Sequence, residues 1–237
     1  MDTWILIVSS LVGYLLGSLS FGRIVARFVN PKVDLDHVDM MIPGADEPYQ
    51  LKSIGGNTAS MKLGPRVGCT VGLLDILKVF LPTLVVRLIY PDQYYFLVVA
   101  TAGFVGHCWP IYYRFKGGRG ISAFYGGLFA IDPVGGFVVA IGSLLIGMVI
   151  LKELLFAYAG GVLLVIPWLW FTTHNLFYLA YALVINLLFI LAMIPELKQI
   201  IELRRKYGKT DMKASMETFP MGQQMLRLMN KLNRKSE

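Results

Sequence analysis

Residues 154–195 read LLFAYAGGVLLVIPWLWFTTHNLFYLAYALVINLLFILAMIP and contain no Asp, Glu, Lys or Arg. As one helix, these 42 residues would extend for roughly 63 Å, about twice the thickness of the hydrocarbon core of a bilayer. The segment must therefore fold back, and the polar residues Thr172–Asn175, which follow Pro167, are the predicted turn. The stretch predicts two adjacent membrane-spanning helices.

Five more apolar segments precede this pair: Thr3–Gly22, Val67–Ile89, Gln93–Tyr113, Ile121–Ile131 and Val134–Leu151. Ile121–Ile131 is short, so we expect a half-length or partly buried helix there. The composition agrees, because 56% of the 237 residues are hydrophobic, 16% are charged, and the mean hydropathy is +0.61. The sequence therefore predicts an all-α, polytopic integral membrane bundle of about seven transmembrane helices in residues 1–195, followed by a basic cytoplasmic tail in residues 196–237.

The basic residues predict the orientation of this bundle. Alternating seven spans divides the connecting segments into two sets, and all of the 22 Lys and Arg residues except Lys78 and Arg87 fall in one set. By the positive-inside rule, the N-terminus then lies outside and the C-terminal tail lies in the cytoplasm. The formal net charge of +7 comes in short blocks between apolar runs, with no nucleic-acid motif. We therefore expect no nucleic-acid partner.

The tail allows two interpretations. Its apolar residues recur at helical spacing, with Arg and Lys between them: Met221, Met225, Leu228, Met229 and Leu232. One interpretation is a cationic amphipathic helix that lies on the inner leaflet. The other is a solvated, partly disordered tail.

The stretch Lys116-Gly117-Gly118-Arg119-Gly120 is the strongest local signal for a ligand site. Glycines allow a tight turn and close approach to a ligand. The stretch precedes the predicted helix at Ile121, and the start of a helix favours an anion. Lys116 and Arg119 add positive charge, and a guanidinium can bind phosphate through two hydrogen bonds. The stretch predicts a phosphate-binding loop; the alternative is an ordinary basic loop that follows the positive-inside rule.

A second glycine-rich stretch, Ser53–Ser60, is followed by Lys62 and enters the second predicted span on the same face. This pattern predicts that the two stretches converge on one phosphate. The alternative is a helix N-cap region, because Ser, Thr and Asn are favoured there. Taken alone, the stretch fits that alternative better.

Other ionisable residues fit structural roles. Asp75 and Lys78 lie three apart on one helical face, so we expect an ion pair inside the membrane. His107 has no acidic residue among the five that follow it, which favours packing at the membrane interface over a general base. The three histidines are too scattered for a metal site, and Cys69 and Cys108 have no metal-ligand spacing. We expect no metal and no cofactor.

Three ordered motifs resemble those of the acyl-phosphate-dependent glycerol-3-phosphate acyltransferases (PlsY-type). The matching residues are GYLLGSLSFG at 13–22 for the first motif; Leu63-Gly64, Gly68 and LLDILK at 73–78 for the second; and Gly106-His107, Pro110 and FKGGRG at 115–120 for the third. The resemblance covers roughly residues 5 to 200.

The resemblance implies a seven-helix enzyme of the inner (plasma) membrane with its active site facing the cytoplasm. It implies transfer of an acyl group from acyl phosphate to the 1-hydroxyl of sn-glycerol 3-phosphate, giving lysophosphatidic acid in phospholipid biosynthesis without acyl-CoA. The candidate catalytic residues are then Ser53, Asn57, Ser60 and Lys62. The candidate substrate-binding residues are Gly55, Gly56, His107, Lys116, Gly117, Gly118, Arg119, Gly120, Glu196 and Gln199. We expect a monomer whose partners are the lipid bilayer, acyl phosphate and glycerol 3-phosphate.

The chain departs from the family's pattern in three places. Met61 takes the position of an arginine in the second motif, with Lys62 as the candidate replacement for its charge and Ser53 as the nearest candidate for the motif's serine. Extra residues separate the first two motifs, among them Asp34, Asp36, Asp39, Asp46 and Glu47. At the closing motif, Glu196 and Gln199 stand in place of a histidine and an asparagine.

Two alternative functions stay open at this point. One is a non-catalytic lipid- or anion-binding membrane protein on the same scaffold, which the lost closing motif favours. The other is an acyltransferase for a related polyol phosphate. A transporter would need ionisable residues deep in several spans, and here only Asp75 and Lys78 qualify. The acyl-CoA-dependent acyltransferases use an H-x4-D motif, which none of the three histidines begins.

Overall fold

The computed structural model describes residues 2–40, 49–51, 53–208, 212–217, 220, 222–223 and 226–227. The chain forms two compact units, each built from two separate parts of the sequence. Unit 1 contains Met1–Phe21 and Gly72–Met193, and unit 2 contains Gly22–Val71 and Ile194–Glu237. Helices α4 and α9 contribute residues to both units.

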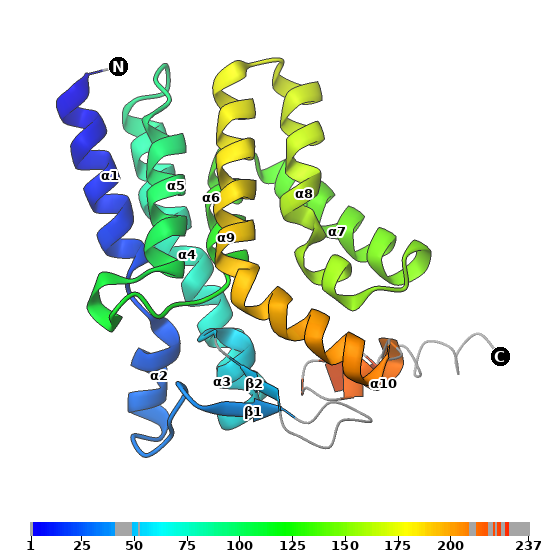
Figure 1. Ribbon diagram of the computed structural model, residues 1–237. Helices are drawn as coiled ribbons and strands as arrows, with labels where there is room; N and C mark the ends of the chain where they lie inside the picture. Colours follow the sequence, from blue (N-terminus) through cyan, green and yellow to red (C-terminus); the bar gives the residue numbers. More distant parts are fainter. Residues whose placement is uncertain are drawn as a thin grey trace. The chain divides into compact units, whose positions relative to one another are not determined.

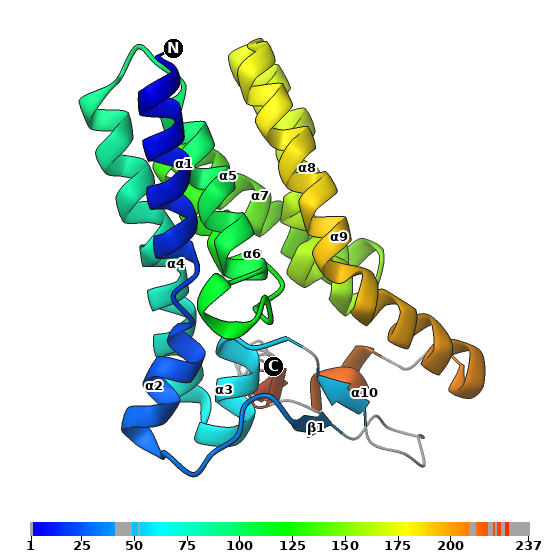
Figure 2. The same cartoon turned by 60° about the vertical axis from the view of Figure 1, so that its left-hand side comes forward.

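Unit 1 is a bundle of apolar helices, seen in Figures 1 and 2. Its helices are α1 (Thr3–Gly17), most of α4 (Pro65–Ile89), α5 (Tyr95–Cys108), α6 (Ile121–Ile131), α7 (Pro133–Leu145), α8 (Leu154–Thr173) and the first part of α9 (Leu176–Tyr207). A 3-10 turn, η1 (Ile111–Tyr113), follows α5, and a π-helical turn, η2 (Ile146–Ile150), follows α7. Large apolar side chains such as Trp4, Leu88 and Phe171 are exposed on the outside of the bundle, where lipid is the expected solvent.

Helices α1 and α5 pack side by side and run in the same direction (Figure 1). At their starts, the backbone N–H of Asp2 donates to the hydroxyl of Tyr95. Near the end of α1, Gly17 lies so close to Gly103 that a side chain on Gly17 would overlap the backbone of α5. Small residues of this kind allow helices in a membrane to approach closely.

Polar contacts between different helices lie at one end of unit 1. At this end, Asn175 Nδ2 donates to the Tyr94 hydroxyl at 2.7 Å, and Arg87 Nη1 donates to the Ala130 carbonyl at 2.6 Å. Helix α5 leads from this end to the loop of residues 109–120, and α6 leads back (Figure 1). Helix α6 has only 11 residues, fewer than α1, α5, α7 or α8.

The predicted polytopic membrane bundle is confirmed. Among the described residues, six helical segments are long and apolar enough to cross a membrane. Three of them join two elements: α1 with α2 (Thr3–Val29), α5 with η1 (Tyr95–Tyr113) and α7 with η2 (Pro133–Ile150). The remaining predicted span, Ile121–Ile131, is α6. Its length of about 17 Å is shorter than the hydrocarbon core. The predicted turn at Thr172–Asn175 is also confirmed, because α8 ends at Thr173 and α9 begins at Leu176.

The boundary between bundle and tail stays a prediction. Helix α9 runs without a break through the predicted boundary at residue 195 and ends at Tyr207. Helix α10 (Met212–Glu217) follows it. All five apolar positions of the predicted tail helix lie outside the described residues.

Unit 2 contains most of α2 (Phe21–Val29), the strands β1 (Val38–Met40) and β2 (Tyr49–Leu51), α3 (Gly56–Leu63), the start of α4, the end of α9, and α10. The two strands pair antiparallel, with Val38 opposite Leu51. Both side chains are buried and pack against Met61 of α3 and Leu203 of α9. The extra residues between the first two motifs therefore include a hairpin with its own small apolar core.

The orientation of the bundle can be tested with reporters. A reporter inserted after Asp92, in the exposed turn between α4 and α5, should be found outside the cell. A reporter fused after Glu237 should be found in the cytoplasm, because all but two of the basic residues lie in segments assigned to that side. The opposite result for both reporters would invert the membrane orientation predicted from the sequence.

Candidate active site

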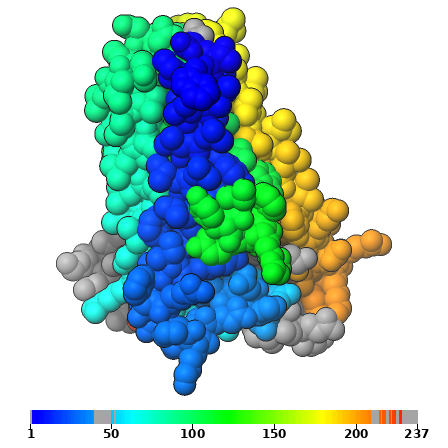
Figure 3. Space-filling view, turned by 90° about the vertical axis from the view of Figure 1, so that its left-hand side faces the viewer, coloured from blue at the N-terminus to red at the C-terminus, as the bar shows by residue number. Residues whose placement is uncertain are grey.

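The loop of residues 109–120, between α5 and α6, carries the strongest candidate site. Figure 3 shows this part of the chain in green, at the surface beside α1 in dark blue. Arg114 and Phe115 have φ values of 53° and 60°, in the left-handed region. Such values are costly for residues other than glycine and cluster at functional sites. The Phe115 N–H donates to the Pro110 carbonyl at 3.0 Å, so the turn just before Lys116 is closed by the backbone itself.

Gly117 and Gly118 both lie against His107. The Gly118 N–H donates to the His107 carbonyl at 3.1 Å. A side chain on Gly118 would overlap the His107 ring, and a side chain on Gly117 would overlap the His107 carbonyl oxygen. The sequence attributed these glycines to tight turning and ligand approach, but the structure gives a different reason, which is close packing on His107. Of the three loop glycines, only Gly120 has a left-handed φ, of 89°.

Helix α6 begins at Ile121, where the sequence predicted a helix start. A side chain on Gly120, the residue before it, would overlap the Phe104 ring and the Cys108 sulfur, so the chain enters the helix close to α5. The first N–H groups of an α-helix have no acceptor within the helix, and the dipole makes this end positive. The start of α6 therefore suits an anion held by the loop.

Two cationic side chains extend from this loop. Lys116 is exposed and Arg119 is half-buried. The Arg119 guanidinium lies 6.0 Å from the ring centre of Tyr158 in α8. An aromatic face attracts a guanidinium, so this contact helps to fix the position of the Arg119 head group. Sequence reasoning missed Tyr158, because a tyrosine in an apolar helix gives no local signal.

Three ionisable side chains are buried together at the loop: Asp75, Lys78 and His107, with exposed fractions of 2%, 8% and 7%. Asp75 Oδ1 and Lys78 Nζ are 2.8 Å apart, which confirms the predicted ion pair. His107 Nδ1 is 3.7 Å from the same carboxylate oxygen, too far for a hydrogen bond, so the ring packs beside the carboxylate without bonding to it. The His107 ring therefore lies between the ion pair and Gly118.

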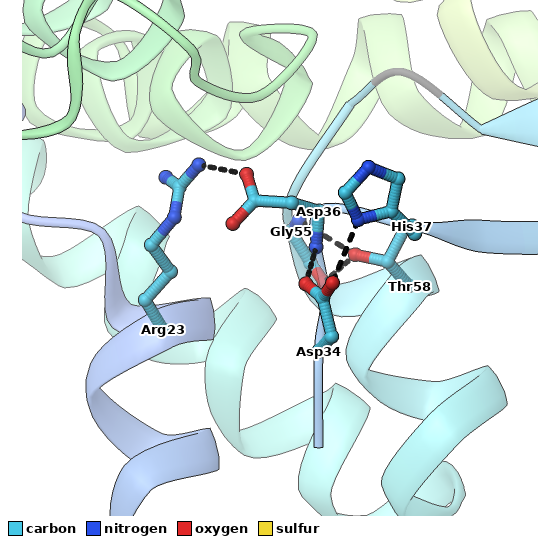
Figure 4. Close-up of polar contacts among 6 residues, drawn as sticks. All are labelled: Arg23, Asp34, Asp36, His37, Gly55 and Thr58. Atoms are coloured by element: carbon cyan, nitrogen blue, oxygen red, sulfur yellow. Dashed lines mark hydrogen bonds and ion pairs between the residues drawn. The ribbon is translucent and has the colours of Figure 1, made fainter. Parts of the chain in front are cut away.

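The second candidate stretch forms the start of α3 in unit 2, drawn in Figure 4. The Gly55 N–H donates to the Thr58 hydroxyl oxygen at 2.9 Å, and that hydroxyl donates to the Gly55 carbonyl at 2.9 Å. Gly56 is the first residue of the helix. This arrangement is a helix N-terminus closed by a threonine side chain, so the helix-start interpretation of the sequence is confirmed.

The acidic residues before β1 have partners within unit 2 (Figure 4). Arg23 Nη2 pairs with Asp36 Oδ1 at 2.7 Å, and His37 Nδ1 lies 2.7 Å from Asp34 Oδ2. The hydrogen bond with His37, together with the Asp36 N–H, lowers the pKa of Asp34 below its ordinary value, so this carboxylate is charged at neutral pH. Both acidic side chains therefore have a basic partner. No group of three metal-binding side chains occurs among the described residues.

The four candidate catalytic residues differ in accessibility. Ser60 is 0% exposed and packs against Gly68 of α4, where a side chain would overlap Ser60 Cβ. Ser53 and Asn57 are half-buried, and Lys62 is exposed. Ser60 is therefore the least accessible of the four, and the catalytic role of all four residues stays a prediction.

Glu196 and Gln199 lie on the part of α9 that belongs to unit 2, and both are half-buried. The Gln199 Oε1 atom is buried and has no hydrogen-bond partner among the described residues.

The hairpin gives a physical reason for one departure from the family's motif. Met61, which takes the position of an arginine, packs against Val38 and Leu51 of the hairpin. An apolar side chain fits this small core, whereas an arginine would place a charge in it. The hairpin core therefore accounts for an apolar residue at position 61.

The candidate residues fall into two groups. Unit 1 contains His107 and Lys116–Gly120 and brings them together, joined by Asp75, Lys78 and Tyr158. Unit 2 contains all the others: Ser53, Gly55, Gly56, Asn57, Ser60, Lys62, Glu196 and Gln199. The convergence of both groups on one phosphate stays a prediction.

The sequence model of the family described as "Glycerol-3-phosphate acyltransferase" matches residues 7–203. The chain belongs to this family. The match includes all three sequence motifs and both groups of candidate residues.

Relatives and a solved structure agree with this assignment. A glycerol-3-phosphate acyltransferase of Halalkalibacterium halodurans is 34% identical over 174 residues, 71% of this chain and 77% of the relative. One of Mycoplasma mycoides is 33% identical over 134 residues, 54% of this chain, and the match spans only about half of that relative, 47%. The crystal structure of PlsY, an integral membrane glycerol 3-phosphate acyltransferase in its glycerol 3-phosphate form, has the same fold. Its TM-score is 0.69 at 24% identity, covering 84% of this chain and 93% of that one.

Proposed function

We propose that the protein transfers an acyl group from acyl phosphate to the 1-hydroxyl of sn-glycerol 3-phosphate, giving lysophosphatidic acid for phospholipid biosynthesis. The observation that carries the proposal is the family match, which includes a loop whose charges and position suit an anion. Lys116 and Arg119 extend from this loop immediately before the N-terminus of α6. Charge and helix dipole there both favour a phosphate.

The chemistry of the proposed reaction asks little of the protein beyond positioning. An acyl phosphate is already activated. The hydroxyl oxygen bonds to the acyl carbon, the bond from that carbon to the phosphate oxygen breaks, and the leaving phosphate takes the hydroxyl proton. The protein then has to orient two anions and offset their charge. Lys116, Arg119 and the start of α6 are suited to this in unit 1, and Lys62 is the exposed cation among the candidates in unit 2.

We infer that the protein lies in the inner (plasma) membrane with the loop of Lys116 and Arg119 on the cytoplasmic side. The supporting observation is the distribution of basic residues, which places this loop in the same set as the C-terminal tail. A monomer is sufficient for the proposed loop, because its glycines, its cations and His107 come from one chain.

One assay separates the proposal from its alternatives. Purified protein supplied with acyl phosphate and glycerol 3-phosphate should form lysophosphatidate, and acyl-CoA should not replace acyl phosphate. Binding of glycerol 3-phosphate without turnover would favour a non-catalytic binding protein. Turnover of another polyol phosphate in preference to glycerol 3-phosphate would favour the related acceptor.

A further inference from the structure

Residues Ser18–Ser20 separate helices α1 and α2. Such a break leaves backbone groups without their helical partners, which is costly away from water. The ion pair of α4 supplies two replacements. Lys78 Nζ donates to the Leu19 carbonyl at 2.6 Å, and the Phe21 N–H hydrogen-bonds to Asp75. Both members of the ion pair therefore hydrogen-bond to backbone groups at the break between α1 and α2.

The same carboxylate is connected to the phosphate loop through His107. One side of the ring places Nδ1 at 3.7 Å from Asp75 Oδ1. The opposite nitrogen, Nε2, occupies the space that a Gly118 side chain would need, and the His107 carbonyl accepts from the Gly118 N–H at 3.1 Å. The loop backbone at Gly118 packs directly on the ring. A movement of the ring would therefore change the packing of the loop.

The two charged groups of the pair have different tasks. An ammonium group only donates hydrogen bonds, so only Lys78 can satisfy the Leu19 carbonyl. A carboxylate only accepts them, so only Asp75 can satisfy the Phe21 N–H. An ion pair that merely neutralised buried charge would work equally well with its two members exchanged. Here the backbone groups fix which residue stands at which position.

We propose that Asp75 and Lys78 are positioning residues for substrate binding, and that His107 transmits their position to the phosphate loop. The pair fixes two segments at once, the break at Ser18–Ser20 and the loop at Gly118. The inference rests on the proposed function in one respect, because it takes the loop to hold a substrate phosphate. It assigns these three residues to the geometry of the site, with no direct contact to the substrate.

The test is an exchange of the two residues, Asp75→Lys with Lys78→Asp. The exchange keeps the net charge and the spacing but presents each backbone group with the wrong partner. Glycerol 3-phosphate binding should be measured by calorimetry on purified, monodisperse protein, together with KM and kcat. We expect binding to weaken about tenfold or more, the size of one lost charge-assisted contact, and KM to change more than kcat. His107→Ala, which removes the ring behind Gly118 and leaves both charges in place, should change the same quantities in the same direction.

Two controls complete the test. Lys78→Arg keeps the charge and a donor and should retain most of the binding. Thr83→Val replaces another buried polar side chain of α4 with one of similar shape and should leave binding unchanged. If the exchanged protein is not monodisperse, glycerol 3-phosphate binding by the His107→Ala variant decides whether the inference holds. Binding equal to that of the wild type in every folded variant would overturn the inference. A wild-type protein that binds glycerol 3-phosphate but transfers no acyl group would instead overturn the proposed function, and the binding data would still decide the inference.

Discussion

Replacing Lys116 with alanine should lower the turnover efficiency of acyl transfer about ten- to a hundredfold. A charge-assisted hydrogen bond is worth roughly 1.5–3 kcal/mol, and about 1.4 kcal/mol corresponds to a factor of ten. Arg119→Lys keeps the charge but loses the planar pair of donors, so its activity should lie between those of the wild type and Arg119→Ala. The measurement is kcat/KM for glycerol 3-phosphate on proteins that are monodisperse in detergent.

Gly118→Val should be at least as damaging, for a reason that depends on His107. A side chain at this position would overlap the His107 ring, so either the ring or the loop has to move. Gly72→Val is the matched control, because a Cβ added at Gly72 in α4 would meet no atom within 4 Å beyond its chain neighbours and its own helix backbone. The control should therefore retain its activity.

The competing interpretation treats the loop as an ordinary basic segment of a membrane protein. It expects Lys116→Ala to behave like Lys32→Ala, which removes an exposed lysine outside the loop. If Lys116→Ala and Gly118→Val both kept full activity, the phosphate-loop assignment would be wrong. The site would then have to be sought in the stretch from Ser53 to Lys62.

The membrane fold could be predicted because it follows from local properties of the chain. Residues 154–195 are too long and too apolar for one crossing, and the polar turn at Thr172–Asn175 is where they fold back. Helix α6 marks the limit of this reasoning. Its apolar residues predicted a helix, but its place between the two ends of unit 1 depends on contacts such as that of Arg87 with the Ala130 carbonyl.

The candidate site in unit 1 could be predicted only in part. Charge and glycine content marked Lys116–Gly120, and the spacing of three residues marked the pair of Asp75 and Lys78. The contact of His107 with that pair joins different helices and has no local signal. For the same reason, the sequence could not show that Gly118 is required by a histidine ring, since this depends on tertiary packing.

The stretch in unit 2 was harder to interpret because the added hairpin changes its surroundings. Ser60 is a polar residue in a glycine-rich stretch, which made it a candidate catalytic residue. In the structure it is buried against Gly68. Met61 reads as a lost arginine, yet it belongs to a small apolar core with Val38. In both cases the residue type is explained by a neighbour from another element, which the motif alone does not contain.

The close packing of α1 on α5 leads to the second large effect that we expect. Gly17→Ala should lower the thermal midpoint of the detergent-solubilised protein by about 2–12 °C, since overpacking typically costs about 1–3 kcal/mol. The added carbon would lie 2.7 Å from the Gly103 Cα and 2.8 Å from its carbonyl carbon. Backbone atoms cannot rotate away as a side chain can, so the two helices would have to separate.

Gly142→Ala in α7 is the matched control for Gly17→Ala. Its added carbon would lie 3.5 Å from Leu164 Cδ1, an ordinary contact distance, so the midpoint should stay the same or rise slightly. Because the break at Ser18–Ser20 follows α1 directly, Gly17→Ala should also weaken glycerol 3-phosphate binding, whereas Gly142→Ala should not. An unchanged midpoint for Gly17→Ala would show that α1 and α5 do not pack through these glycines. A lowered midpoint with unchanged binding would show that the packing of α1 stabilises the fold without setting the geometry of the break.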